Sequence, residues 1–206
     1  IGQVKYVGEL LNSLSSEEID DTAIVLGDER MLIPLINSIP SNIKNINVTM
    51  GYPLKNSNIF SFFYLLLRIH SKNQSTFYYK YILSILSHEL IAPILNKSTD
   101  VCQMIKKENL IYMTMNEIIE IDKGNKAIFK LLFSKWKDAD EGISSCLELI
   151  ELIKQYYYKN PKKDFINLEL LYNINKIFMQ IKISSKKFDY LKSINSLKVI
   201  FKELCE

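Results

Sequence analysis

From Asn56 onward, apolar residues recur at helical spacing in almost every segment, which limits most of the chain to packed helices. The segment Ile59–Ile69 is apolar on nearly every side, so it predicts a central buried helix capped by Asn56 or Ser57. Residues 111–121 suit either a strand or a helix. We therefore expect residues 56–206 to form a helical subdomain. Its further predicted helices cover residues 77 to about 93, 99–107, 127–136, 143–157, 168–181 and 190–204.

The first 55 residues show a different pattern and hold three of the five Pro and four of the six Gly. Residues 22–26 are a short apolar run that suits a buried strand, and residues 46–50 alternate as a second strand. A short helix over residues 30–38 is predicted between them. This order indicates a right-handed parallel crossover, although two strands are too few for an independent sheet. The expected fold class is α+β and mostly α: a small incomplete parallel α/β segment in residues 1–55, then the helical subdomain in residues 56–206.

Charge is divided unevenly between these two regions. Residues 1–55 hold four basic and seven acidic side chains, a balance of −3, and residues 56–206 hold 22 basic and 16 acidic, a balance of +6. The total of +3 is too small to indicate nucleic-acid binding by itself. Three cysteines without a close cluster argue against a disulfide scaffold or a Cys-rich zinc site and favour a reducing compartment. With no leader pattern and no apolar run of about 18 residues, we expect a piece of a longer cytoplasmic protein without a membrane partner.

Two patterns resemble catalytic motifs but have simpler explanations. Ala23–Glu29 looks like a metal-binding strand of a nucleotide hydrolase, yet the chain contains no phosphate-cradling G-x-x-x-x-G-K-[ST] loop. Asp28 or Glu29 is then expected to cap the N–H groups of the following helix. The only histidines, His70 and His88, lack the further ligands that zinc requires, so we interpret them as histidines packed on apolar neighbours. We predict no metal and no catalytic residue.

Tyrosines and lysines give the remaining candidate sites. Tyr78-Tyr79 and residues 156–158, with lysines nearby, would suit base stacking beside phosphate contacts. Amphipathic helices with half-buried tyrosines are the simpler explanation, and we favour it. Residues 159–163 and 182–187 are basic turns that flank one predicted helix. They would suit a phosphate-contacting edge or plain solvated loop ends.

Residues 22–88 also carry a resemblance to a known family. The segments Thr22-Ala-Ile-Val-Leu-Gly-Asp-Glu-Arg-Met-Leu-Ile-Pro-Leu35, Ile39-Pro40, Ile46-Asn-Val-Thr-Met-Gly-Tyr-Pro-Leu54 and Phe77-Tyr-Tyr-Lys80 follow one another in this order. They resemble the AddB-type helicase–nuclease subunits, and most of all a branch of PD-(D/E)XK nuclease proteins with an inactivated superfamily I helicase region. Residues after 95 are similar only in being helical.

The resemblance implies that residues 1–55 are part of a second motor-like helicase domain, with residues 56–206 as its helical insertion and Gly51 and Tyr52 at the passage between them. It requires two side-by-side strands bridged by a helix in residues 22–54. The parent protein would process DNA double-strand ends for recombination repair, together with an ATP-driven partner subunit. Active members carry an arginine motif where this chain has Gly27-Asp28-Glu29, and two carboxylates there would repel a triphosphate. The resemblance therefore implies no nucleotide cofactor for this segment.

Our leading hypothesis is a noncatalytic helicase-like fragment that scaffolds or guides DNA within a DNA-repair helicase–nuclease. The alternative is a helical docking module that binds a partner subunit through an apolar face and does not contact DNA. A stand-alone enzyme would instead require a pocket with convergent titratable groups. The predicted DNA-contacting residues are Tyr52, Lys55, Arg68, Lys162, Lys163, Lys186 and Lys187.

Overall fold

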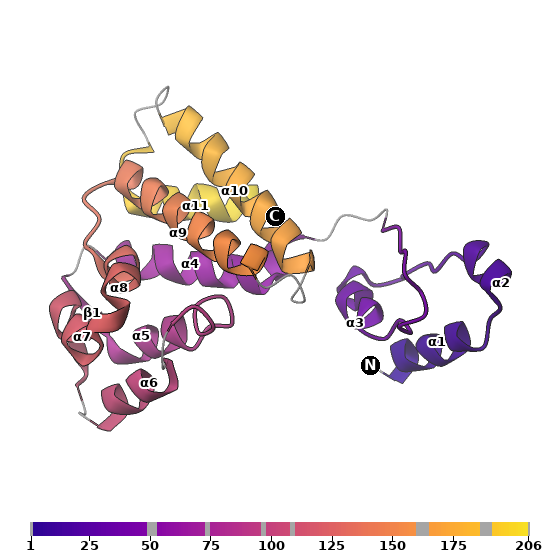
Figure 1. Ribbon diagram of the computed structural model, residues 1–206. Helices are drawn as coiled ribbons and strands as arrows, with labels where there is room; N and C mark the ends of the chain where they lie inside the picture. Colours follow the sequence, from indigo (N-terminus) through magenta and orange to yellow (C-terminus); the bar gives the residue numbers. More distant parts are fainter. Residues whose placement is uncertain are drawn as a thin grey trace. The chain divides into compact units, whose positions relative to one another are not determined.

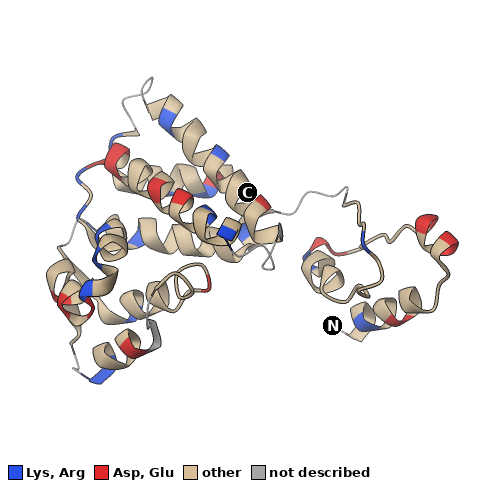
Figure 2. Cartoon of the chain, viewed as in Figure 1, with Lys and Arg blue, Asp and Glu red and all other residues tan. Residues whose placement is uncertain are grey.

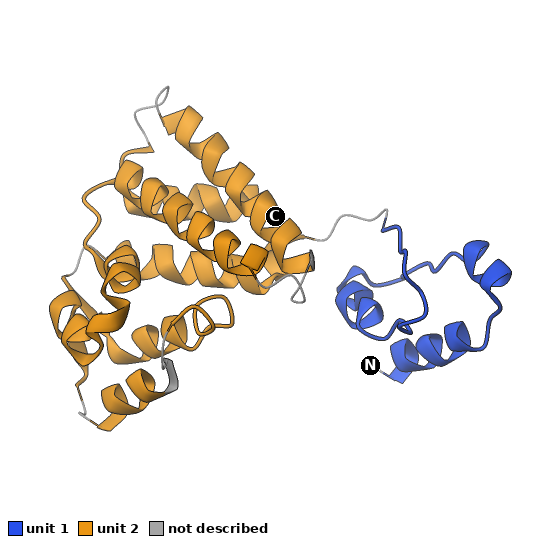
Figure 3. Cartoon of the chain, viewed as in Figure 1, with its two compact units in different colours: residues 1–52 blue, residues 53–206 orange. Residues whose placement is uncertain are grey.

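The computed structural model describes residues 2–48, 53–72, 75–95, 98–107, 110–159, 165–185 and 191–205. The chain divides into two compact units, unit 1 (residues 1–52) and unit 2 (residues 53–206), close to the boundary expected at residue 55 (Figure 3). Helices make up most of the described residues, in which a single sheet of two strands is present (Figure 1). The expectation of a mostly α fold with some β structure is confirmed.

Unit 1 is built on the packing of α1 against α3. Its buried apolar side chains in the described residues are Val4 and Leu11 of α1 and Leu32 and Leu35 of α3. The helix predicted between the two expected strands is present as α3, with its two leucines inward as their spacing requires. The elements of unit 1 are α1 (Gly2–Asn12), α2 (Ser16–Asp20), η1 (Glu29–Met31) and α3 (Leu32–Ile36).

The expected parallel pair of strands is not confirmed. Residues 22–26 and 46–48 form no strand and do not pair with each other or with another described segment. Residues 49 and 50 lie outside the described residues. Val25 is 91% exposed, whereas a buried strand would hide it. An apolar run becomes a buried strand only when other strands pair with its backbone and another layer covers its face. Unit 1 supplies neither for these two segments, so we correct both to unpaired chain.

Unit 2 contains a bundle of four helices that includes α4. Ser57 begins α4, since its hydroxyl oxygen accepts the Phe60 N–H at 3.1 Å, and this confirms one of the two predicted caps. Phe62, Phe63 and Leu66 of α4 are fully buried, as the nearly all-apolar pattern predicted. Helices α10 and α11 pack against α4, and α9 packs against α10 and α11 (Figure 1). The bounds are η2 (Leu54–Asn56), α4 (Asn58–His70), α9 (Ala139–Lys159), α10 (Phe165–Ser185) and α11 (Ile194–Leu204).

The sheet and four shorter helices form the rest of unit 2. Strands β1 and β2 are antiparallel, with Phe77 opposite Met113 and Tyr78 opposite Tyr112. Phe77 and Met113 are buried, so the alternation of a strand sends the two tyrosines to the other face. The bounds are β1 (Thr76–Tyr78), α5 (Tyr79–Leu86), α6 (Ser98–Lys107), β2 (Tyr112–Thr114), α7 (Met115–Ile121), η3 (Lys123–Asn125) and α8 (Lys126–Phe133).

Two sequence predictions for this part change. The helix expected from Phe77 to about Pro93 begins only at Tyr79 and ends at Leu86, because residues 76–78 pair as a strand. The ambiguous segment 111–121 is a strand followed by a helix. Thr114 and Glu117 form a reciprocal capping box at that helix, which fixes where it begins.

Candidate nucleic-acid interface

Of the seven residues predicted to contact DNA, the structure describes Lys55 and Arg68. Lys55 lies in η2 and donates its backbone N–H to the Cys205 carbonyl oxygen at 3.1 Å, and Arg68 lies in the last turn of α4. The rise along a helix places residues thirteen positions apart at a distance of about 20 Å, so these two do not form one compact site. The five predicted residues Tyr52, Lys162, Lys163, Lys186 and Lys187 lie outside the described residues.

Three tyrosines gather beside Arg68. Strand pairing sets Tyr78 opposite Tyr112, with 5.6 Å between ring centroids and 49° between ring planes. Tyr81, in the first turn of α5, has its ring centroid 5.7 Å from that of Tyr78 at an angle of 76°. The rings meet at an angle, so none of the three is stacked face to face on another. They contribute to a cavity of about 290 Å³, here called the tyrosine pocket, which is lined by Ile69, Lys72, Thr76, Phe77, Tyr78, Tyr81 and Tyr112.

Two cations lie against the Tyr81 side of the tyrosine pocket. The guanidinium carbon of Arg68 is 5.5 Å from the Tyr81 ring centroid, and its Nη2 donates to the Tyr81 hydroxyl at 3.4 Å. The Lys72 ammonium is 5.8 Å from the same centroid. Both distances lie within the range of cation–π attraction, about 6 Å. Among the described residues neither cation has a carboxylate partner, so their charge is available to an anion.

The sequence around the tyrosine pocket adds to its positive charge. Residues 56–88 contain the cations Arg68, Lys72 and Lys80 and no Asp or Glu, and residues 110–116 around β2 contain no acidic side chain either. Helix α9, by contrast, carries both acidic and basic residues (Figure 2). Unlike-charge neighbours reduce the local potential, whereas a stretch of one sign concentrates it. The tyrosine pocket therefore combines cations and aromatic rings with no acidic residue in the adjoining segments 56–88 and 110–116.

The inner wall of the tyrosine pocket rests on a buried histidine. The His70 ring lies 5.4 Å from that of Phe77 and stacks on Trp136 at 3.8 Å and 15°. Its Nε2 is 2.8 Å from the Leu132 carbonyl oxygen, and since a carbonyl only accepts, Nε2 carries the proton. Burial lowers the pKa of His70 to about 4, so the ring is neutral at pH 7. His70 thus packs on apolar neighbours as the sequence predicted, and it holds Phe77 in place.

A second cavity of about 440 Å³ opens at the start of α9 and is acidic. Asp138 accepts the Glu141 N–H at 2.9 Å, and Glu141 pairs with Lys137 at 3.4 Å. These contacts cap the helix and complement its dipole. Within the described ranges no group of three or more His, Cys, Asp and Glu side chains is arranged to hold a metal ion. Asp138 and Glu141 are thus explained by the helix that begins beside them.

The motif resembling a nucleotide-hydrolase strand has a local role. Asp28 accepts the backbone N–H of Arg30 at 3.0 Å and caps η1, which confirms the capping role predicted for this position. The same carboxylate binds the Arg30 guanidinium at 2.9 Å. The hydrogen bond from Arg30 lowers the pKa of Asp28, so the pair remains ionised at neutral pH. Arg30 is thus engaged with Asp28.

Sequence reasoning identified Tyr78 and Arg68 but missed Lys72, Tyr81 and Tyr112 as parts of one site. Tyr81 has a local signal, since it lies three positions after Tyr78. Tyr112 has none, because its place depends on the pairing of β1 with β2 across 34 residues. The other expected tyrosine cluster, residues 156–158, does not present its tyrosines on one surface, because Tyr157 is buried and Tyr158 is exposed.

Comparison of the chain with protein-family models, curated proteins and solved structures gives no match. The resemblance of residues 22–88 to the AddB-type subunits therefore stays a prediction. No helix in the described part of the chain has the length and hydropathy needed to cross a membrane.

Proposed function

We propose that this chain is a noncatalytic DNA-binding element that scaffolds or guides DNA. The observation that carries the proposal is the tyrosine pocket, where Tyr78, Tyr81 and Tyr112 lie beside Arg68 and Lys72. Nucleic-acid affinity comes mainly from cations that neutralise phosphates, and aromatic side chains add stacking with bases. A short stretch of chain that offers both, with no acidic residue from 56 to 88, suits this ligand.

The cellular setting in this proposal comes from the resemblance alone. In that setting the chain would belong to a cytoplasmic helicase–nuclease that repairs DNA double-strand breaks by recombination. The parent protein would have an inactivated helicase region and an ATP-driven partner subunit. The strand pair that this kinship requires is not formed by residues 22–26 and 46–48. DNA binding at the tyrosine pocket does not depend on this kinship, because the contacts that form the pocket lie within unit 2.

The salt dependence of binding tests the proposal. Single-stranded and duplex oligonucleotides are titrated with the full chain at several salt concentrations, using the wild type and the double variant Arg68→Gln/Lys72→Gln. If both cations contact phosphates of a single strand, the slope of log K against log salt becomes shallower by about 1.4 in this variant. Lys123→Gln/Lys137→Gln is the matched control, because it also removes two charges, from lysines already paired with Glu120 and Glu141. Absence of binding at low salt, or equal slopes in all three proteins, would refute the proposal.

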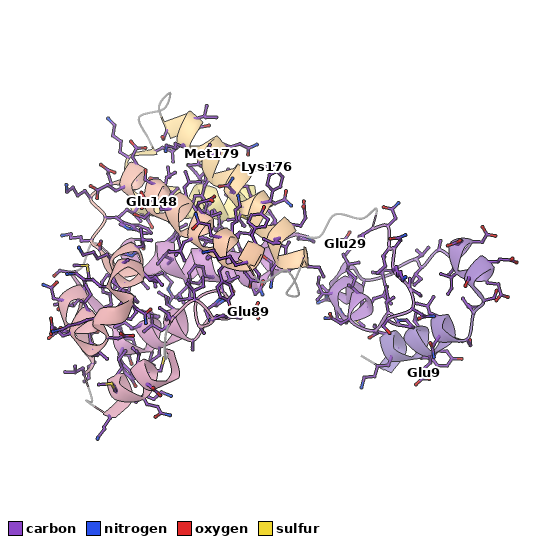
Figure 4. All side chains as sticks on the ribbon, viewed as in Figure 1. Glu9, Glu29, Glu89, Glu148, Lys176 and Met179 are labelled. Atoms are coloured by element: carbon purple, nitrogen blue, oxygen red, sulfur yellow. The ribbon has the colours of Figure 1, made fainter. Side chains whose placement is uncertain are left out.

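A second candidate function is docking of a partner subunit without DNA contact. One face of α10 favours it, because Tyr172, Met179 and Ile183 follow helical spacing and are exposed. Figure 4 labels Lys176 and Met179 of this helix. Under this candidate, hydrogen exchange of residues 172–183 slows when the partner subunit is added, and the Met179→Glu variant loses that protection. Under the DNA-binding proposal, Met179→Glu leaves oligonucleotide affinity unchanged.

A further inference from the structure

Resting on the proposed function, we infer that the tyrosine pocket takes one unpaired base of single-stranded DNA while Arg68 and Lys72 hold a neighbouring phosphate. The pocket has two chemically different sides. Arg68 and Lys72 both lie against Tyr81, at 5.5 Å and 5.8 Å from its ring centroid, and Tyr112 lies on the strand opposite Tyr78. A nucleotide has the same two parts, a charged phosphate and a flat base.

The aromatic side of the pocket offers an open ring face. Tyr112 is 58% exposed, and it lies at the end of the ladder, where β2 begins and where it pairs with Tyr78. Tyr78 contacts it at a tilt of 49° and contacts Tyr81 at 76°, so none of the three rings covers another face to face. A base that stacks on such a ring contributes about 1–3 kcal/mol per base, with little preference among the four bases.

The size and rigidity of the pocket fit a single small planar group. Its volume of about 290 Å³ lies at the lower end of ligand pockets, which start at about 300 Å³. The wall beneath it is fixed, since Phe77 is buried and touches the His70 ring, which in turn stacks on Trp136. A wall that is already ordered loses little conformational entropy when a base binds.

The geometry selects unpaired over paired DNA. In a duplex each base lies between its neighbours in the stack, and exposing its face costs a few kcal/mol. An unpaired strand presents its bases at lower cost, and it can still set a phosphate against Arg68 and Lys72. A proline-rich peptide would also dock on exposed tyrosines, but it would leave the two cations without an anion. The cations therefore favour a nucleotide strand.

Four fluorescent ligands test this inference on the full chain at one low salt concentration: an oligothymidylate of about 12 nucleotides, the same strand with abasic sites, its duplex, and a proline-rich peptide. We expect the intact strand to bind most tightly. The loss of stacking in the abasic strand or in Tyr112→Ala should weaken binding by about 5- to 150-fold, the fold-change that corresponds to the energy of one stacked base. Tyr112→Phe keeps the ring and should restore the affinity.

Tyr172→Ala is the matched control. Tyr172 is also exposed and also lies near a cation, since the Lys176 ammonium is 4.4 Å from its ring centroid, but it does not line the tyrosine pocket. We expect this variant to bind like the wild type.

The outcomes separate the inference from the proposed function. Equal binding of intact and abasic strands, with no effect of Tyr112→Ala, would overturn base recognition and leave phosphate binding in place. A preference for the duplex or for the peptide would also overturn the inference. Absence of binding by every oligonucleotide would overturn both.

Discussion

The pH dependence of folding should reveal the buried His70. The imidazole donates Nε2–H to the Leu132 carbonyl oxygen and stacks on Trp136, and burial holds its pKa at about 4 instead of 6.5. The perturbation is a decrease of pH from 7 to 5, applied to the wild type and to His70→Gln. Glutamine keeps an N–H donor and does not titrate in this range.

The size of the effect follows from the difference in pKa between the folded and unfolded chains. As the pH falls through 6.5, the unfolded chain takes up a proton at His70 that the folded chain does not bind until about pH 4. The contribution of the neutral His70 to the free energy of unfolding is therefore complete above about pH 6.5 and is lost progressively down to about pH 4. Integrated over this range the loss is about 3 kcal/mol, of which about 2 kcal/mol falls between pH 7 and pH 5.

Urea unfolding at several pH values measures this loss. We expect the wild type to lose about 2 kcal/mol more than His70→Gln between pH 7 and pH 5. His88→Gln is the comparison variant: the pKa of His88 is also lowered by burial, but its ring is only partly covered, so its removal should flatten the profile less. If His70→Gln showed the same decrease in stability as the wild type, the assignment of a neutral, desolvated imidazole would be wrong.

Two further predictions concern packing and thiol chemistry. A Cβ on Gly8 would overlap the Ser38 carbonyl oxygen, so Gly8→Ala should destabilise unit 1 by about 1–3 kcal/mol in thermal or urea unfolding. A Cβ on Gly2 meets open space, so Gly2→Ala should leave the stability unchanged. Equal stability of the two variants would contradict this packing. Burial raises the pKa of all three thiols, with Cys102 the least enclosed and Cys146 fully buried. Iodoacetamide followed by mass spectrometry should therefore label Cys102 first, and earlier labelling of Cys146 would refute the burial.

The sequence predicted the helices of unit 2 well because their apolar period reports directly which side faces the core. The pattern of α4 predicted a buried helix, and its Phe62 and Phe63 are fully buried. The strands were predicted poorly, because a strand depends on a partner that the local pattern does not name. Residues 22–26 have the composition of a strand and form none. Residues 77 and 78 were expected to begin a helix, but they belong to the strand 76–78, which pairs with residues 112–114.

In the candidate site too, residues with a local signal could be predicted, and a residue placed by strand pairing could not. Arg68 and Tyr78 could be selected from the sequence because each belongs to a segment with its own local signal. Tyr112 could not, because it reaches Tyr78 only through the antiparallel register of β1 and β2. Five of the seven predicted DNA contacts lie outside the described residues, so only Lys55 and Arg68 can be compared with the structure.

The most direct test of the central claim is to map the binding of single-stranded DNA onto the full chain by amide chemical shifts. We predict that an oligothymidylate shifts the amide signals of residues 68–72, 76–81 and 110–114 first, and those of residues 172–183 on α10 little. Shifts confined to α10 or to unit 1, or no shifts at low salt, would contradict the claim that the tyrosine pocket binds DNA.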